Sequence, residues 1–269
     1  RFFGDGLFLS SDGKGRMVPV SHQAPAARLD DRYPFRLNTG RVRDQWHTMT
    51  RTARSPRLSA HLPEPFLEIH PEDARRLDLH EAALVRVQNS QGRSILRARV
   101  TDSVRQGEVF APMHWTGETA PSARIDALVA PVVDPVSGQP ESKAAAVNVA
   151  PFDAAWYGFA VSRRELAPKG DYWTRTRTAS GYRAELAGTE VPADWEGFAR
   201  EVFITNAEVQ ALEDRARGIH RFAFTRDGRL EAALFVSRNT AAFTRDDLAG
   251  LPGREAPGVL SGPPPADMP

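Results

Sequence analysis

A hairpin pattern in the middle of the chain constrains the fold most strongly. Residues 84–89 and 94–100 are two short apolar runs, and the four residues between them, with Gly92 among them, are a turn signal. Apolar residues alternate along both runs: Val85 and Val87 on the first, Leu96, Ala98 and Val100 on the second. A period of two predicts a pair of strands that each bury one face.

Neighbouring segments extend this pattern into a barrel. Residues 66–69 and 108–113 are predicted strands, and residues 33–37 form a further short apolar run. Pro71 opens a short predicted helix, because proline is favoured at the first helical position and acidic residues follow it. Short strands, few helices and a non-repeating order favour a closed β-barrel over a doubly wound sheet.

Composition excludes several classes of partner and site. The 269 residues contain 35 Lys and Arg against 34 Asp and Glu, which gives no electrostatic argument for DNA, RNA or an acidic membrane as partner. The chain has no cysteine, so it offers no disulfide, thiolate zinc site or iron–sulfur ligand of its own. No apolar run approaches the length needed to cross a bilayer.

The chain divides into four predicted segments. These are a lead-in at residues 1–32, the barrel at 33–151, a C-terminal extension at 152–255 and a Pro-rich linker at 256–269. In the lead-in, residues 7–9 and 17–20 are short strand candidates beside a glycine-rich turn. Because the chain does not begin with Met and ends in a Pro-rich run, we expect a domain of a larger protein.

The extension has weaker patterns than the barrel. Residues 221–224 and 230–236 flank an Asp-Gly turn and predict a hairpin. Residues 206–217 are a predicted helix with Asn206 as its N-cap, and one more helical turn is predicted to start at Thr244. The aromatic residues between 152 and 206 follow no clear period.

Residues 38–52 carry the most chemistry in the chain. Asn38 to Arg41 are predicted to form a turn in which Gly40 lets the backbone approach a ligand, and Arg41 offers a planar cationic fork. Trp46 can stack on a ring, while His47 and Thr48 can hydrogen-bond. The alternatives are an ordinary strand-to-loop turn and a buried Trp beside a satisfied His.

Two later segments are weaker candidates. His114 and Trp115 end a predicted barrel strand, where they can point into a cleft or close the core. Residues 133–143, which end at Lys143, are rich in turn formers and by themselves predict a surface loop. Because no catalytic triad, phosphate-binding loop or dinucleotide fingerprint occurs, the residues alone support a ligand-binding barrel without an independent active site.

Four segments together resemble the C-terminal part of the bacterial assimilatory nitrate reductases, within the molybdopterin-dependent oxidoreductase family. The segments are YPFRLNTGRVRDQWHTMTRT at 33–52, PFLEIHPEDA at 65–74, VFAPMHW at 109–115 and DPVSGQPESK at 134–143. Residues 2–20 are similar to the segment that precedes this domain in such enzymes. The match covers residues 1–150 and, more weakly, the tail.

The resemblance implies a molybdopterin dinucleotide-binding domain. Its fold would be mainly β with short helices: a six-stranded double-psi β-barrel followed by a small α+β extension. It would cover one side of a bis-molybdopterin guanine dinucleotide cofactor that carries molybdenum. The cofactor-binding residues carried over from the family are Thr39, Gly40, Arg41, Trp46, His47, Thr48, His114 and Lys143. Asp126 stands where the family commonly has Asn, and we expect its carboxylate to face the pterin edge.

The resemblance also implies a function for the parent protein. That protein would be a cytoplasmic molybdenum enzyme that reduces nitrate to nitrite in nitrate assimilation. Its iron–sulfur clusters and metal ligand would lie outside this chain, which would supply neither catalytic nor metal-binding residues and would not be catalytic alone. Its partners would be the remainder of the parent catalytic chain and an electron-donor protein or reductase subunit, without nucleic acid or membrane.

Two alternatives remain open from the sequence. One is the equivalent domain of a molybdenum formate dehydrogenase, in which the barrel, Arg41, the hydroxyl residues and Lys143 are expected as well. Residues 46–52 favour nitrate reductase over this alternative. The other is a non-catalytic barrel that binds a nucleotide or a protein.

Overall fold

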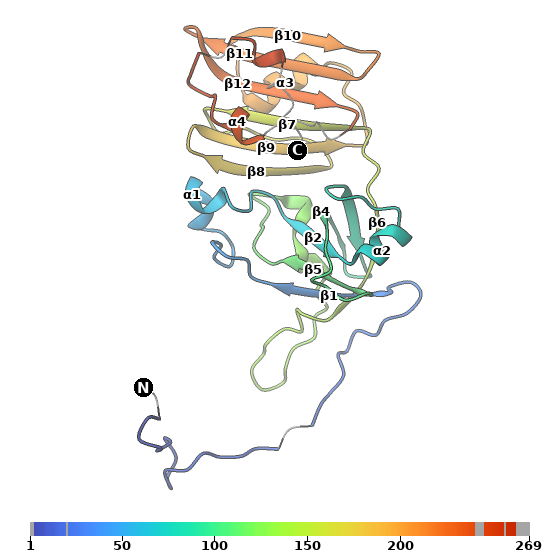
Figure 1. Cartoon of the computed structure of the whole chain (residues 1–269), viewed down its shortest axis with the longest axis vertical. Helices are drawn as coiled ribbons and strands as arrows, with labels where there is room; N and C mark the ends of the chain where they lie inside the picture. The colour runs from blue at the N-terminus through green and yellow to red at the C-terminus, as the bar shows by residue number, and fades with distance from the viewer. Residues whose placement is uncertain (1–2, 20, 240–244, 256, 262–269) are drawn as a thin grey trace.

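The chain forms two stacked β structures, a closed barrel and an open sheet (Figure 1). The structure is a computed structural model that describes residues 3–19, 21–239, 245–255 and 257–261. The lead-in extends away from the barrel, and the loop at residues 131–141 projects on the same side. Within the described residues, no helix has both the length and the apolar character that a membrane span requires.

The barrel is closed and mixed, with the strand order β1-β5-β2-β4-β3-β6. The strands are β1 (Phe35–Gly40), β2 (Phe66–Ile69), β3 (Leu84–Gln88), β4 (Arg93–Val100), β5 (Glu108–Pro112) and β6 (Ala145–Pro151). The pairs β1–β5 and β2–β4 are parallel, and the other pairs are antiparallel. The prediction of a mainly β fold built on a six-stranded barrel is therefore confirmed.

Alternating apolar side chains fill the barrel. Leu37, Leu67, Val85, Leu96 and Val109 are each 0% exposed and belong to one contiguous core. Each such side chain contributes roughly 1.5–3 kcal/mol by its burial. The barrel interior is thus a packed core, and any ligand has to bind at one of its ends or on its outer surface.

Short helices connect the barrel strands. They are η1 (Thr52–Arg54), α1 (Pro56–Ser59), α2 (Pro71–Arg76), η2 (Pro121–Ala123) and η3 (Ile125–Leu128). The predicted helix at Pro71 is confirmed as α2, and the His70 ring caps it by accepting from the Glu72 N–H. The buried Asp73 carboxylate accepts from the Gly107 N–H at 2.7 Å, which ties α2 to the start of β5.

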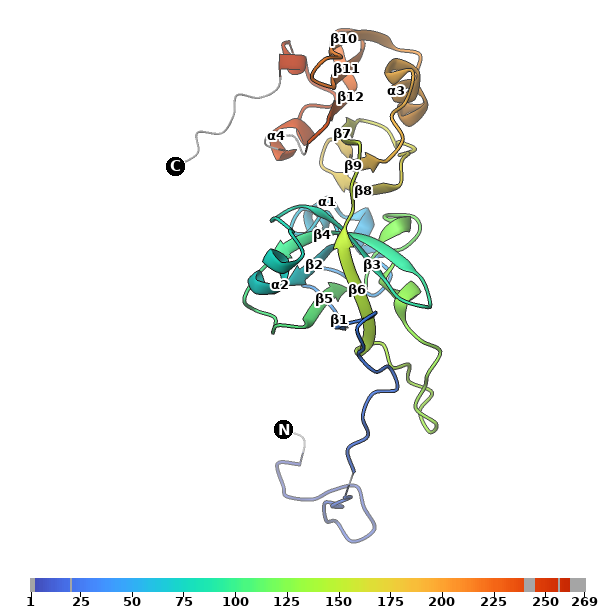
Figure 2. The same cartoon turned by 90° about the vertical axis from the view of Figure 1, so that its right-hand side faces the viewer.

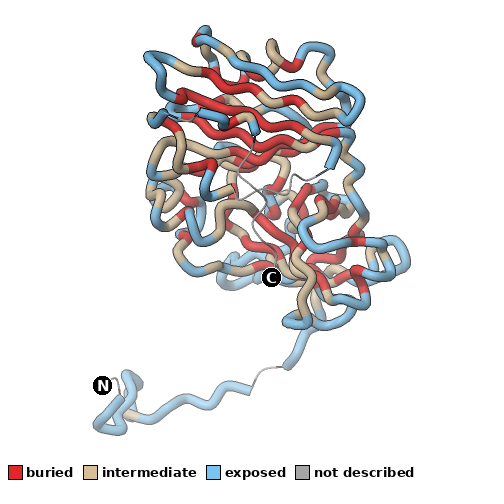
Figure 3. Tube along the Cα trace, turned by 45° about the horizontal axis from the view of Figure 1, so that its top comes forward, coloured by how far each residue is buried: buried red, intermediate tan, exposed pale blue. Residues whose placement is uncertain are grey.

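The second sheet is antiparallel, with the order β10-β11-β12-β7-β9-β8. Its strands are β7 (Trp156–Ser162), β8 (Tyr172–Thr178), β9 (Gly181–Gly188), β10 (Glu208–Asp214), β11 (Ile219–Arg226) and β12 (Arg229–Ser237). Helix α3 (Trp195–Phe203) covers one face, and α4 (Arg245–Ala249) with η4 (Val259–Ser261) covers the other (Figure 2). Both faces of the central strands are therefore buried (Figure 3).

The barrel and the second sheet share a small apolar and ionic interface. Leu84 and Ile95 of the barrel pack against Tyr172 and Ala187 of the sheet. Beside them Arg97 donates to both carboxylate oxygens of Glu64, at 2.9 and 2.8 Å. The Tyr172 hydroxyl donates to the same carboxylate at 2.8 Å.

The charges at this interface depend on one another. Arg97 also lies 3.8 Å from Glu185 of β9. Burial alone would raise the pKa of Glu64, but the charge and hydrogen bonds of Arg97 outweigh it and lower that pKa. Burial and the neighbouring Glu64 charge raise the pKa of Glu185, and the two carboxylates raise the pKa of Arg97 against its own burial. One guanidinium therefore neutralises carboxylates from both parts of the molecule.

Two predicted elements are wrong because tertiary pairing decides the backbone. Residues 206–217, predicted as a helix, contain β10, which pairs with β11 from Glu208↔Thr225 to Asp214↔Ile219. The predicted turn at residues 38–40 is the end of β1, since Asn38, Thr39 and Gly40 continue the parallel ladder with β5. In both places hydrogen bonds to a partner strand override local preference.

The other predictions concern the lead-in and the C-terminal extension, where some are confirmed and others are wrong. Residues 7–9 and 17–19 form no strand, because no described segment pairs with them, and Val20 lies outside the described residues. The hairpin predicted at residues 221–236 is confirmed as β11 and β12, and the last helical turn is confirmed as α4, although Thr244 itself lies outside the described residues. Residues 256 and 262–269 of the predicted linker also lie outside them.

Candidate functional site

The predicted site residues gather at one end of the barrel. Strands β1, β3 and β5 run in the same direction, so their ends at Gly40, Gln88 and Pro112 lie together with the start of β6 at Ala145. The loops that carry Arg41 to Thr48, His114 and Lys143 all leave from this end. The barrel topology thus brings together segments that are about 100 residues apart in the sequence.

Three exposed side chains form a cluster on the loop after β1. An Arg41 N–H donates to Nδ1 of His47 at 3.2 Å, and the Arg41 guanidinium lies 5.4 Å from the centre of the Trp46 ring. The Trp46 and His47 rings meet edge to face at 4.5 Å. Because guanidinium can only donate, Nδ1 of His47 accepts and its proton is on Nε2.

The cluster presents both a ring and a cation to solvent. Trp46 is 55% exposed, which is unusual for a side chain of its size. This arrangement overturns the alternative of a buried Trp, and it offers a stacking surface beside a positive charge.

His114 lies beneath this loop and is 0% exposed. Its Nε2 accepts from the Val42 N–H at 2.9 Å, and its Nδ1 donates to the Trp46 and His47 carbonyl oxygens at 2.9 and 3.1 Å. These partners fix the tautomer with hydrogen on Nδ1. Both ring nitrogens are occupied by the loop backbone, so His114 positions the loop.

The environment of His114 favours its neutral form. Burial lowers the pKa of the ring, and electrostatic interactions with Arg41 and His47 lower it further, although the two carbonyl acceptors act in the opposite direction. The neutral ring is the form that can accept from the Val42 N–H. The hydrogen bonds of His114 and its lowered pKa therefore both favour the neutral ring.

A second set of contacts fixes the end of β1. The hydroxyl of Thr39, which is 4% exposed, donates to the Ser142 carbonyl at 2.7 Å, and the Lys143 ammonium donates to the Thr39 carbonyl at 2.6 Å. Thr39 is therefore held inside the protein. Lys143 is an exposed side chain whose ammonium carries further N–H donors beyond the one it uses here.

Gly40 has a packing requirement that the sequence alone did not indicate. A Cβ at this position would lie 2.9 Å from Cε2 of Phe110. The space beside Gly40 on that side is thus occupied by an aromatic ring of the neighbouring strand β5. A side chain at this position would therefore require the Phe110 ring to shift, whether or not a ligand also approaches the backbone.

The surroundings of Asp126 differ from those of the other predicted site residues. It is exposed on η3, which is tied to the turn between β3 and β4 because Nδ2 of Asn89 donates to the Leu128 carbonyl at 2.8 Å. The Gly92 backbone also approaches the Ala127 carbonyl closely. Within the described residues the Asp126 carboxylate forms no ion pair or hydrogen bond with Arg41 or Lys143, so its role at the pterin edge stays a prediction.

A cavity next to Thr48 contains residues that the sequence did not point out. Its volume is about 400 Å³, and its walls carry the hydroxyl groups of Thr48, Thr50, Thr116 and Thr119 with the charged groups of Arg54 and Glu118. The Thr48 and Thr50 hydroxyls lie 2.6 Å apart. Thr116 and Thr119 follow His114 and Trp115 closely in the sequence. Their recurring hydroxyl groups are the signal that could have indicated this part of the cavity.

The loop after β1 also holds strained and incompletely bonded groups. Asp44 and Met49 adopt left-handed backbone conformations with φ of 73° and 57°, and Met49 is buried. Oε1 of the buried Gln45 has no hydrogen-bond partner among the described residues. Strain and an unfilled buried acceptor are typical of segments that bind a ligand, since such costs persist only where the surroundings enforce them.

The barrel and its loop cluster belong to a known family of cofactor-binding domains. The family model described as "Molydopterin dinucleotide binding domain" matches residues 35–146. That range holds the first five barrel strands and the start of β6, together with every predicted site residue. This part of the chain is therefore a molybdopterin dinucleotide-binding domain.

Curated relatives include both nitrate reductases and formate dehydrogenases. A nitrate reductase of Klebsiella oxytoca is 44% identical over 68% of this chain and 21% of its own length. An assimilatory nitrate reductase catalytic subunit of Bacillus subtilis is 32% identical over 50% of this chain and 18% of its own length. The alpha subunit of an F420-dependent formate dehydrogenase of Methanocaldococcus jannaschii is 35% identical over 53% of this chain and 20% of its own length.

These relatives are much longer than the chain. It spans about a fifth of the length of each of the three. The similarity thus establishes a molybdopterin oxidoreductase domain, and it confirms the resemblance on which the site residues were predicted.

Proposed function

We propose that this chain is the cofactor-binding domain of a molybdenum nitrate reductase that reduces nitrate to nitrite in nitrate assimilation. The observation that carries the proposal is the 44% identity to a nitrate reductase over 68% of the chain, a longer stretch than the family model covers. The matched formate dehydrogenase covers 53% of the chain at 35% identity.

The donor groups at the barrel end fit a bis-molybdopterin guanine dinucleotide. Its diphosphate groups favour Arg, Lys, hydroxyl and backbone N–H donors, and Arg41, Thr48 and Lys143 are exposed at this end. Trp46 offers a surface for stacking on a planar ring. In this proposal His114 and Thr39 act through the backbone that they hold, because both are buried and hydrogen-bonded within the protein.

The bound cofactor would supply the molybdenum and the redox chemistry, in which nitrate takes up two electrons and two protons and gives nitrite and water. The residues of this chain would bind and orient one side of the cofactor. The electrons would come from iron–sulfur centres outside the chain, fed by an electron-donor protein or reductase subunit. The remainder of the parent catalytic chain would cover the other side, and the enzyme would work in the cytoplasm.

One observation favours a second candidate function. Formate dehydrogenase subunits match the same chain at 35% identity, and the barrel, Arg41 and Lys143 suit either reaction. Formate oxidation in the parent enzyme is therefore the alternative activity.

The experiment that tests the proposal is an assay of the intact parent protein with each substrate. We expect reduction of nitrate by a low-potential electron donor and no oxidation of formate by an electron acceptor. Formate oxidation without nitrate reduction would contradict the proposal and would support formate dehydrogenase, the second candidate function. Tight binding of a simple guanine nucleotide, in a parent protein without molybdenum, would replace both with a nucleotide-binding barrel.

A further inference from the structure

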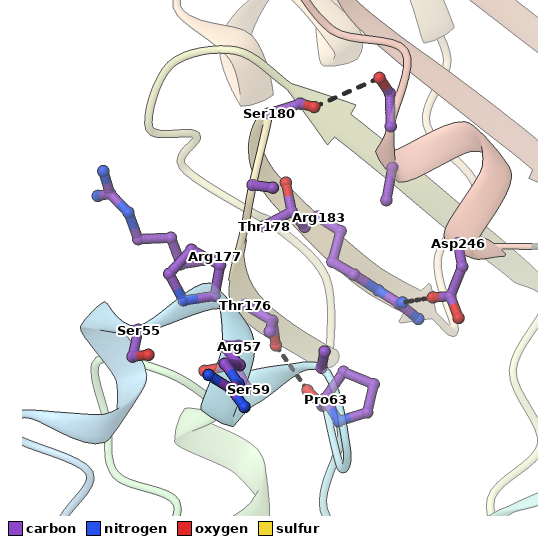
Figure 4. Close-up of a pocket in the computed structure, with 15 residues that line it drawn as sticks. Ser55, Arg57, Ser59, Pro63, Thr176, Arg177, Thr178, Ser180, Arg183 and Asp246 are labelled. Carbon is purple, nitrogen blue, oxygen red and sulfur yellow. Dashed lines mark hydrogen bonds and ion pairs between the residues drawn. The ribbon is translucent and has the colours of Figure 1, made fainter.

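An apolar cavity in the described part of the chain lies away from the cofactor loop. It has a volume of about 580 Å³ and lies where the barrel meets the second sheet (Figure 4). Its barrel wall is α1 and Pro63, and its opposite wall is the turn between β8 and β9 together with α4. Cavities of this size at the junction of two folded units commonly bind small molecules.

The walls are held in place by one hydrogen bond between the two units and by two contacts within the second unit. The Thr176 hydroxyl donates to the Pro63 carbonyl at 2.6 Å across the junction, and the Ser180 hydroxyl donates to the Gly250 carbonyl at 3.3 Å. Arg183 pairs with Asp246 at 2.8 Å on the α4 side (Figure 4). The cavity is thus formed by the folded structure itself, and both of its walls are fixed before any ligand arrives.

Most of the exposed lining is apolar. The apolar surface comes from proline and alanine side chains on both walls, namely Pro56, Ala60, Pro63, Ala179 and Ala249. A ligand with an apolar body would therefore replace water that has few hydrogen-bond partners there.

Positively charged side chains outnumber negatively charged ones in the cavity lining. Three arginines line the cavity against one carboxylate, Asp246, and that carboxylate is paired with Arg183. Arg57 has no carboxylate partner among the described residues. Arg177 donates to the Tyr182 hydroxyl at 2.8 Å and stacks on that ring. Both contacts are with a neutral group, and within the described residues no carboxylate pairs with Arg177 either. The rim of an apolar cavity thus carries an excess of positive charge.

We propose that this cavity is a second small-molecule site that binds an organic anion with an apolar body, such as an aromatic carboxylate. The apolar walls take up the body of the ligand, and Arg57 on the barrel wall supplies the positive charge for its negative group. The site is separate from the cofactor loop, so it stands or falls independently of the proposed nitrate reductase activity. Because the walls come from two units, a bound ligand also holds them together.

Calorimetric titration of the intact parent protein with two matched probes tests this proposal. The probes are naphthoate and naphthylmethanol, which share the ring system and differ in the carboxylate. We expect naphthoate to bind at one site per chain and to bind about fivefold more tightly than the alcohol, which is the ratio for a contribution of about 1 kcal/mol from an exposed ion pair. Arg57→Gln removes most of that preference.

Variants that fill the cavity locate the binding. Ala60→Trp and Ala179→Trp place a large ring on opposite walls at positions that are exposed, so the fold tolerates them. We expect both to abolish naphthoate binding, while Val136→Trp, on the projecting loop at a site 94% exposed, leaves it unchanged. Absence of naphthoate binding, or binding that survives both cavity variants, overturns the proposal. Equal affinity for acid and alcohol overturns the anion preference.

Discussion

Replacement of His114 by Phe tests whether this buried ring holds the cofactor loop. The change removes the acceptor of the Val42 N–H and the donor to the Trp46 and His47 carbonyls, at 2.9, 2.9 and 3.1 Å. A buried group left without its hydrogen bond costs about 1–3 kcal/mol. Val42 is only half-buried and the carbonyls belong to exposed residues, so water can replace part of the loss.

The expected decrease in the free energy of unfolding is therefore about 2–4 kcal/mol, a large part of the stability of a domain. Urea denaturation of the intact chain measures it, and hydrogen exchange of the Val42 amide reports the loop directly. His47→Phe is the matched control, because this imidazole is exposed on the same loop, and a surface change costs less than about 0.5 kcal/mol. Equal stability of the wild type and His114→Phe, with unchanged protection of the Val42 amide, would refute this account of the loop.

Three further perturbations follow from the structure. Because burial lowers the pKa of His114 below its usual 6.5, the unfolded state binds more protons as the pH falls below that value, and stability should decrease there by at most about 1.4 kcal/mol per pH unit. Arg97→Met should destabilise the chain by about 3–5 kcal/mol in urea denaturation, because Glu64 would remain buried without its counter-charge. Gly40→Ala should cost about 1–3 kcal/mol in the same measurement, since its Cβ would meet the Phe110 ring at 2.9 Å.

Each of these predictions has its own control. The pH dependence should be smaller in His114→Phe, and an identical profile would contradict the assignment to His114. Arg99→Met removes an arginine whose side chain is 42% exposed, and it should cost far less than Arg97→Met. A Cβ added at Gly117, on an exposed loop, would meet only open space, so Gly117→Ala should be nearly neutral. A similar cost for both glycine variants would contradict the packing argument.

Local sequence patterns were sufficient for much of the barrel. The strands at Phe66–Ile69 and Arg93–Val100 have short apolar runs between clear turn signals, so their pattern reflects the face that each buries. By contrast β6 has the sequence AAVNVAP, whose small residues give little alternation, and these residues alone do not predict a strand. Its position is set by pairing with β1 and β3.

The extension was harder to predict for a related reason. In β7 nearly every residue is buried, because α3 and α4 cover opposite faces of the sheet, and a period of two is lost when both faces are apolar. Strand β10 is mostly exposed at the sheet edge, and its polar sequence resembles a surface helix. Only the pairing with β11 distinguishes the two.

The candidate site, too, could be predicted from the sequence only in part. The residue types of Arg41, Trp46 and Lys143 indicated an anionic, planar ligand from sequence alone. The sequence could not show that His114 is enclosed and bonded to the loop backbone, because this depends on the approach of β5 to a loop about 70 residues earlier. Nor could it show that the ring of Phe110 lies close beside Gly40.

We propose that this barrel end binds a molybdopterin guanine dinucleotide in its parent enzyme. The most direct test is the molybdenum and acid-released GMP content of the intact parent protein, measured for the wild type and for a double variant, Arg41→Glu with Lys143→Glu. We predict molybdenum and GMP in the wild type, and loss of most of both in the folded double variant, because two diphosphate partners would become repulsive. Equal molybdenum and GMP contents in the two proteins would contradict the claim.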